Sequence, residues 1–168
     1  SSNSQYNVAV GTYAMRNANA DSDDVAVGYD ALNGPNPGSS NTAIGSNALK
    51  AMNGGGSNVG LGYGAGNVIT TGSNNTLLGY QAGVAVTTGV NNDVVGYNAA
   101  SNLTTGSSNT LIGNNITTSS ASTTNANGFG LNLTCADNFT TIGQENEPGK
   151  IVLSASATNN ETTKATHS

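Results

Sequence analysis

Carboxylates are the side chains with the most scope for chemistry in this sequence, and they gather in one place. Asp21, Asp23, Asp24 and Asp30 form the only acidic cluster. Ca²⁺ takes several carboxylate oxygens as ligands, so a calcium site is one interpretation of this cluster. The spacing does not match an EF-hand loop, and the cluster occurs once. A solvated loop is therefore favoured, and we expect neither a metal ion nor a cofactor.

The groups of nucleophilic catalysis are almost missing. His167 is the only histidine and is the penultimate residue of the sequence, so no Ser-His-Asp or Cys-His arrangement is expected. Cys135 is the only cysteine and cannot form an internal disulfide. We expect it to be a passive, buried or half-buried thiol. The chain is predicted not to be an enzyme, although carboxylates can act alone, and a polysaccharide-degrading tailspike stays open as an alternative.

The composition argues against charged partners. Only 8% of the 168 residues are charged, against about 25% in typical proteins, and the formal net charge is −5. Four basic residues cannot form the positive stripe that neutralises phosphates, so no nucleic-acid partner is expected. No run approaches the roughly 18 apolar residues of a membrane span, so no membrane insertion is expected either.

A repeat of 17 residues organises the chain. A glycine that follows an aliphatic or aromatic residue recurs at this interval eight times, which defines eight coils between about residues 3 and 138. We number the coils 1 to 8 and count positions in each coil from this glycine. The repeat glycines, expected to form the turn, are Gly11, Gly28, Gly45, Gly62, Gly79, Gly96, Gly113 and Gly130. The predicted domains are the repeat region 1–138, a closing strand segment 139–157 and, at 158–168, a flexible tail or a truncated link to a further domain.

Two apolar columns accompany the repeat glycine and are predicted to form the interior. The column at position −1 holds Val10, Val27, Ile44, Leu61, Leu78, Val95, Ile112 and Phe129. The column at position +3 holds Ala14, Ala31, Ala48, Ala65, Ala82 and Ala99, followed by Ile116 and Leu133. Glycine and β-branched residues disfavour a helix, and 17 residues suit one coil of a parallel β-solenoid with two short strands and two turns. Asn at position −4, with Asp24 substituting in coil 2, predicts a stacked side-chain ladder.

The strand before the glycine is apolar on both faces. Ala43 and Ile44 are adjacent, and adjacent strand residues face opposite sides of a sheet. One of the two faces would meet water in a single chain, whereas strands that are apolar on both faces are usually covered on both. We therefore expect the chain to associate with itself, most economically as a side-by-side homotrimer.

The same phrases carry a resemblance to known fibrous proteins. NVAVG (7–11), DVAVG (24–28), NTAIG (41–45), NTLLG (75–79) and NTLIG (109–113) resemble the head repeats of trimeric autotransporter adhesins. The longer unit with its TGSNNT linker is similar to repeats of viral and phage tail-fibre and spike proteins, and the resemblance covers about 135 residues. It implies a left-handed parallel β-roll, a trimer and a role in attachment. The 17-residue period exceeds that of the bacterial heads, which favours a viral fibre.

Two surface rows are candidates for binding. Tyr29, Tyr63, Tyr80 and Tyr97 share position +1, where a stacked row could hold a carbohydrate or could simply be a packing ladder. The Thr pairs 70–71, 87–88 and 104–105 are in register over three coils, as an ice-binding face requires. The pairs adjoin turns and are missing from the first three coils, so ice binding is kept as the alternative function.

Together these features predict a non-enzymatic structural or attachment domain of a viral or phage fibre, or of a surface adhesin. The expected location is the virion surface or the extracellular space. The expected partners are the chain itself, as a homotrimer, and a host cell-surface glycan or cell wall.

Overall fold

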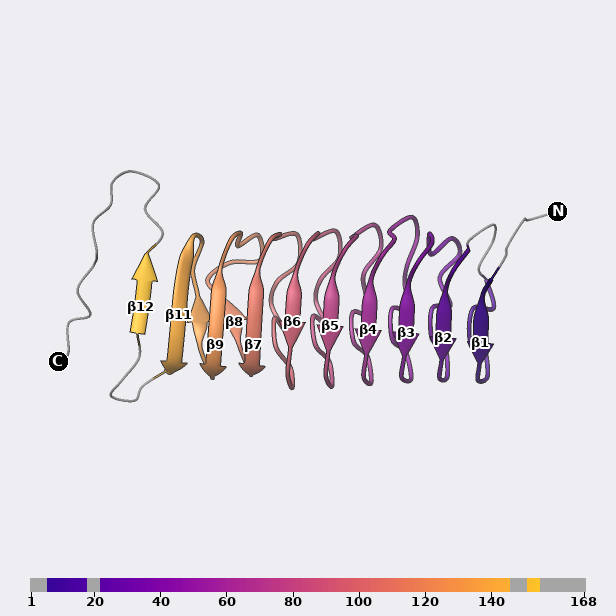
Figure 1. Cartoon of the computed structure of the whole chain (residues 1–168), viewed down its shortest axis with the longest axis horizontal. Helices are drawn as coiled ribbons and strands as arrows, with labels where there is room; N and C mark the ends of the chain where they lie inside the picture. The colour runs from indigo at the N-terminus through magenta and orange to yellow at the C-terminus, as the bar shows by residue number, and fades with distance from the viewer. Residues whose placement is uncertain (1–5, 18–21, 146–150, 155–168) are drawn as a thin grey trace.

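Short parallel strands, one from each coil, stack side by side in chain order to form one long sheet (Figure 1). The computed structural model describes residues 6–17, 22–145 and 151–154. Equivalent residues of neighbouring coils pair 17 positions apart, as Ala26 does with Ala43. The predicted all-β parallel solenoid is thus confirmed. The sheet runs in the order β1 (Val8–Val10), β2 (Val25–Val27), β3 (Thr42–Ile44), β4 (Val59–Leu61), β5 (Thr76–Leu78), β6 (Asp93–Val95), β7 (Thr110–Asn114), β9 (Asn127–Leu131), β11 (Phe139–Gln144) and β12 (Ile151–Ser154).

The repeat glycine ends each of the first six strands. Its φ angle is positive in every coil, for example 138° at Gly28 and 131° at Gly45, a conformation that side chains other than hydrogen rarely adopt. Space imposes the same choice, because a Cβ on Gly28 would lie 2.6 Å from the carbonyl oxygen of Gly45 in the next coil. The glycines therefore let successive coils stack backbone against backbone at the turn.

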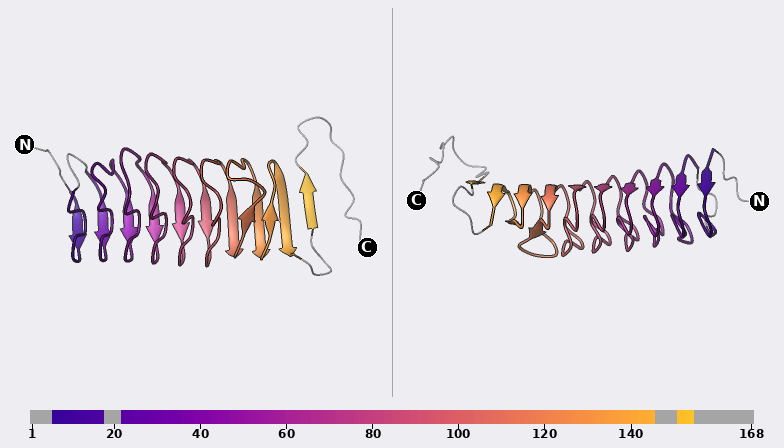
Figure 2. Two further views of the ribbon diagram at one scale, coloured as in Figure 1. Left: turned by 180° about the vertical axis from the view of Figure 1, so that it is seen from behind. Right: turned by 90° about the horizontal axis from the view of Figure 1, so that it is seen from below.

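The wall opposite the long sheet consists mainly of turns rather than of the expected second strands (Figure 2). Residues at position +4 have left-handed backbone there, with φ of 48° at Leu32 and 47° at Leu49. The turns are nevertheless bonded between coils, since Leu32 N–H donates to the Ala48 carbonyl at 3.0 Å. Among the described residues, a second strand forms only in coils 7 and 8, as β8 (Thr117–Thr118) and β10 (Thr134–Cys135), which pair in parallel. In these coils the β-branched Thr117 replaces the Leu, Gly or Ala found at position +4 of coils 2 to 6, and Thr134 follows it in coil 8.

The predicted interior column at position −1 is wrong, because the sheet turns the neighbouring position −2 inward. Ala43 is fully buried, whereas Ile44 beside it is 37% exposed. Successive strand residues alternate faces, so only one of them can enter the interior. The column Val10, Val27, Ile44, Leu61, Leu78, Val95, Ile112 and Phe129 lies on the outer face, half-buried or exposed.

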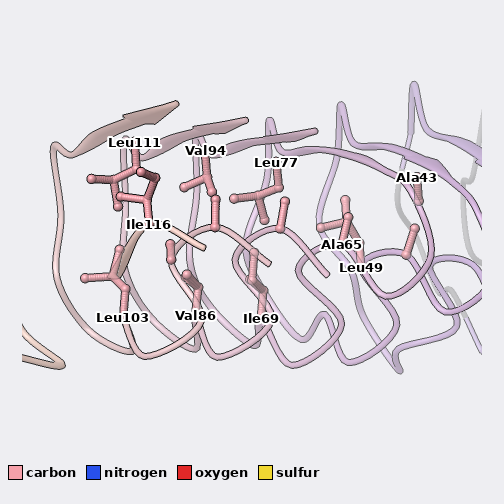
Figure 3. Close-up of a cluster of buried hydrophobic side chains, with 14 of the residues drawn as sticks. Ala43, Leu49, Ala65, Ile69, Leu77, Val86, Val94, Leu103, Leu111 and Ile116 are labelled. Atoms are coloured by element: carbon pink, nitrogen blue, oxygen red, sulfur yellow. The ribbon is translucent and has the colours of Figure 1, made fainter. Parts of the chain in front are cut away.

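Three further columns complete the interior with position −2 (Figure 3). At position +3, Ala31, Ala48, Ala65, Ala82, Ala99, Ile116 and Leu133 are fully buried, and Ala14 is partly buried. Position +4 supplies Leu32 and Leu49, and position +7 supplies Met52, Ile69, Val86 and Leu103, all fully buried. Neither of the last two columns was expected from the sequence.

A ladder of buried amides runs along the rod beside the apolar interior, as predicted. The Oδ1 atom of Asn75 accepts hydrogen bonds from both the backbone N–H and the side-chain amide of Asn92, each at 3.0 Å. The Nδ2 group of Asn75 donates to Asn58 Oδ1 at 3.0 Å and to the Gly89 carbonyl at 2.9 Å. The ladder provides hydrogen-bond partners for backbone groups where the chain turns away from the strands, and it links each coil to the next. Its described members after Asn7 are Asp24, Asn41, Asn58, Asn75, Asn92 and Asn109.

The repeat changes at its C-terminal end. β11 pairs in parallel with β9 after an interval of 13 rather than 17 residues, so that Ile142 lies opposite Phe129. β12 then pairs antiparallel with β11, and the segment expected to close the fold contains these two strands. The predicted flexible tail, residues 158–168, lies outside the described residues.

Candidate functional site

An aliphatic row on the outer face of the long sheet is the first candidate surface. Its members share position −1, together with the corresponding residue of β11, and we call them the outer aliphatic column. Exposure reaches 56% at Val10, 47% at Leu61 and 40% at Ile112, so these side chains are not covered within one chain. The column is Val10, Val27, Ile44, Leu61, Leu78, Val95, Ile112, Phe129 and Ile142.

The neighbouring column at position −3 makes this face low in charge. It shares the outward orientation because it lies two residues away along each strand. Asp93, which is exposed, is the one charged residue in the two columns. The other members of the position −3 column are valines, threonines and one asparagine: Val8, Val25, Thr42, Val59, Thr76, Thr110, Asn127 and Thr140.

The tyrosine row at position +1 is the second candidate surface, just beyond the strand ends. Tyr29, Tyr63, Tyr80 and Tyr97 are between 44% and 54% exposed. Tyr63 and Tyr80 stack with ring centroids 5.3 Å apart and planes at 14°, and Tyr80 and Tyr97 stack at 5.3 Å and 9°. We call Tyr63, Tyr80 and Tyr97 the tyrosine ladder. Each ring covers a face of the next, so the ladder presents ring edges to solvent.

Coil 1 extends the aromatic row in a different geometry. Tyr13 occupies position +2, and its ring meets the ring of Tyr29 edge to face, with centroids 5.7 Å apart and planes at 64°. The guanidinium of Arg16 lies 4.5 Å from the centre of the Tyr13 ring, a cation–π contact. The outer end of the aromatic row is therefore occupied by the protein's own groups.

Two of the four clustered acidic residues, Asp24 and Asp30, are buried and bonded within the fold. Asp24 is fully buried, and its Oδ1 accepts the N–H of Asn41 as a member of the amide ladder. Asp30 forms an ion pair with Lys50, with 2.9 Å between Oδ2 and Nζ, and accepts a hydrogen bond from Asn33 at 2.8 Å. The hydrogen bond and charge of Lys50, helped by Asn33, hold the pKa of the Asp30 carboxyl below its ordinary value. Asp23 is exposed.

No cluster of three metal-binding side chains forms among residues 6–17 and 22–145. Asp21 and His167 lie outside the described residues, and the structure places neither. Cys135 is fully buried, and its sulfur fills the space that the missing side chain of Gly128 leaves open, since a Cβ there would touch Sγ. The thiol is a packing group in the interior.

In each threonine pair the first residue is hydrogen-bonded within the fold and the second is exposed. The hydroxyls of Thr70, Thr87 and Thr104 each donate to a carbonyl of the following coil at 3.2 Å. Their neighbours at 71, 88 and 105 are exposed but lie in turns rather than in a sheet. The outer face of the long sheet instead carries Thr42, Thr76, Thr110 and Thr140 within the position −3 column.

No family model, curated protein or solved structure matches the chain. The described part of the chain contains no helix that is long and apolar enough to cross a membrane. Function must therefore be argued from the two surfaces, the outer aliphatic column and the tyrosine ladder.

Proposed function

We propose that the chain is a non-enzymatic segment of an extracellular attachment fibre, from a virus, a phage or a surface adhesin, and that it works as a homotrimer. The observation that supports this proposal is the outer aliphatic column, which is apolar in every coil and extends from β1 to β11. Isolated apolar side chains are common on protein surfaces, whereas continuous apolar rows mark interaction sites.

A second copy of the same chain suits this row better than an unrelated partner. The row repeats at the spacing of the coils, and another rod with the same repeat would match it side chain for side chain along its length. Closed symmetric assemblies satisfy such self-matching faces in every copy, and three rods around one axis cover each face. The sequence resemblance to trimeric heads and fibre repeats favours three chains over two.

Attachment follows from the display of three equal surfaces on one rigid rod. Weak contacts made by each chain add through effective concentration when the copies are held at fixed spacing. The tyrosine residues lie beyond the strand ends, at the edge of the proposed interface, where they stay open to a ligand. With few charges and many Asn, Ser and Thr side chains, this surface suits a neutral host glycan.

Oligomeric state tests the proposal. Light scattering on the purified chain should give three chain masses, and Leu61→Asp in the outer aliphatic column should dissociate the assembly without loss of β circular dichroism. Thr71→Asp on the exposed turn wall is the matched control and should remain trimeric. A monomeric wild-type chain at high concentration would refute the proposed assembly.

Ice binding is the second candidate, supported by the outer sheet face with Thr42, Thr76, Thr110 and Thr140 in one column. Such a face would have to remain open to ice, so this function requires that the sheet be uncovered. Thermal hysteresis measured on the monomeric Leu61→Asp variant and on the wild type distinguishes the two candidates. If neither sample shows thermal hysteresis, ice binding is ruled out.

A further inference from the structure

We propose that a pyranose ring binds in the gap at Ser46, between Tyr29 and Tyr63, by stacking on the two aromatic rings. This inference rests on the proposed attachment function and names its ligand-binding site. The expectation that the stacked tyrosines themselves are the platform changes with the geometry, because stacked rings hide their faces from a ligand.

The gap arises because coil 3 lacks the aromatic residue that coils 2 and 4 carry at position +1. One face of Tyr63 is covered by Tyr80. Its other face is directed along the rod toward coil 3, where position +1 is the half-buried Ser46. Tyr29 lies on the far side of Ser46 and is 51% exposed, and its contact with Tyr13 is made with the coil on its other side.

The spacing of the coils gives this gap room for one ring. Tyr29 and Tyr63 are two coils apart, and each coil step is about 4.8 Å in a β-sheet. A ring midway between them would lie about 5 Å from each tyrosine, close to the 5.3 Å that separates the stacked rings of the tyrosine ladder. The gap is therefore a missing step of the ladder that a ligand ring can replace.

The chemistry around the gap selects a sugar. A pyranose presents C–H groups on its faces and hydroxyls around its rim, and aromatic faces suit the former while the tyrosine hydroxyls and the Ser46 hydroxyl suit the latter. Asn47, whose amide donates to Ser46 Oγ at 3.3 Å, adds a second polar group at the base. The bases of a nucleic acid also stack on aromatic rings, but the chain's net charge of −5 repels the phosphates that link them.

The other end of the tyrosine ladder provides an internal comparison. The outer face of Tyr97 is directed toward coil 7, where position +1 is the exposed Asn114 and position +1 of coil 8 is Leu131. That face has no second tyrosine beyond it, so a ring there could stack on one side only. Tyr97 is thus the matched control for Tyr63, with the same side chain and nearly the same exposure.

The experiment uses the full chain and methyl glycosides of glucose, galactose, mannose and N-acetylglucosamine, each up to about 50 mM, to cover the millimolar affinity expected of a single sugar. Saturation-transfer NMR and tyrosine fluorescence, which no tryptophan obscures, report binding. Ser46→Tyr fills the gap with the missing step and should abolish binding while preserving the fold. Tyr63→Ala should weaken binding about tenfold or more, the loss of one stacking face, and Tyr97→Ala should change it less than twofold.

Three outcomes would overturn the inference. The first is that no glycoside binds the wild type, and the second is that Ser46→Tyr binds a glycoside as tightly as the wild type does. The third is that adenosine binds the wild type as tightly as the glycosides do. Light scattering on the same samples separates this test from that of the proposed function. A trimer that binds no pyranoside refutes the gap site alone. A monomer whose sugar binding disappears in Ser46→Tyr refutes the assembly and keeps the site.

Discussion

In coils 2 and 3 the larger residue of the pair at positions −2 and +4 lies on the turn wall, whereas in coils 5 to 7 it lies on the sheet. In the first group position −2 is small, with Ala26 and Ala43, and the turn residues Leu32 and Leu49 are large. In the second group position −2 is large, with the fully buried side chains Leu77, Val94 and Leu111. The position +4 residues of these coils are smaller than Leu32 and Leu49: Gly83, Ala100 and Thr117.

Coil 4 is where the large side chain changes walls. Both of its positions are glycine, and the neighbouring coils fill the space. A Cβ on Gly60 would lie 2.8 Å from Cγ of Leu49, and a Cβ on Gly66 would lie 2.6 Å from Cδ1 of Leu77. The repeat therefore keeps the filled volume of the interior constant rather than the residue at a given position, as close packing requires.

The most damaging change expected for this arrangement is Leu77→Ala, which removes the large side chain from a coil that has only Gly83 at position +4. The cavity should lower the free energy of unfolding by about 3 kcal/mol, measured by denaturation at one protein concentration. Val68→Ala, on an exposed turn residue of coil 4, is the control and should change stability by about 0.5 kcal/mol or less.

A double-mutant cycle extends this test. Gly83→Ala alone should destabilise, because its Cβ would lie 2.7 Å from Cδ2 of Leu77. The left-handed backbone alone does not forbid alanine there, since Ala100 has φ of 58° at the same position of the next coil. Combined with Leu77→Ala, the change should cost less than the sum of the two single variants by about 1 kcal/mol. Strict additivity would show that the two walls do not share their volume.

The amide ladder is the part of the interior that both groups of coils share, and breaking it should have a slightly smaller effect. Asn75→Ala leaves the buried backbone N–H of Asn92 without its acceptor, so we expect a loss of about 2 kcal/mol. Asn53→Ala, at an exposed asparagine, should be nearly neutral. Equal effects of the two variants would mean that the ladder adds nothing beyond the apolar packing.

The sequence was sufficient to predict the coils, the turn glycines and the ladder, because each depends on a residue type that recurs at one position. The prediction of the interior was wrong at position −1 because Ala43 and Ile44 are both apolar. Periodicity alone cannot decide which of two adjacent apolar residues faces inward. The exchange of size between positions −2 and +4 was the available signal. It was hidden because neither column is uniform, so each resembles a variable position.

The sequence predicted the position of the candidate site but not its geometry. Shared position +1 located the tyrosines, but only the ring geometry shows that Tyr80 is covered by its neighbours. The proposed role of Ser46 also depends on the structure. A serine in a serine-rich sequence is not distinctive until the structure places it between two coils that carry tyrosine at position +1.

The smallest effect concerns the ion pair that only the N-terminal group of coils contains. Asp30 and Lys50 link coils 2 and 3, whereas coils 5 and 6 have Gln81 and Asn98 at the position of Asp30. Because Lys50 lowers the folded-state pKa of Asp30, the pair stabilises the fold above the unfolded pKa of about 3.9, and this contribution is lost as the pH falls through the folded-state value. The melting temperature of the wild type should therefore exceed that of Lys50→Met at pH 7, and the difference should decline below pH 4 and vanish once the pH is below the folded-state pKa of Asp30. Asp23→Asn, at an exposed carboxylate, should leave this pH dependence unchanged, and a wild-type advantage that persists at low pH would assign the role of Lys50 to packing of its aliphatic stem instead.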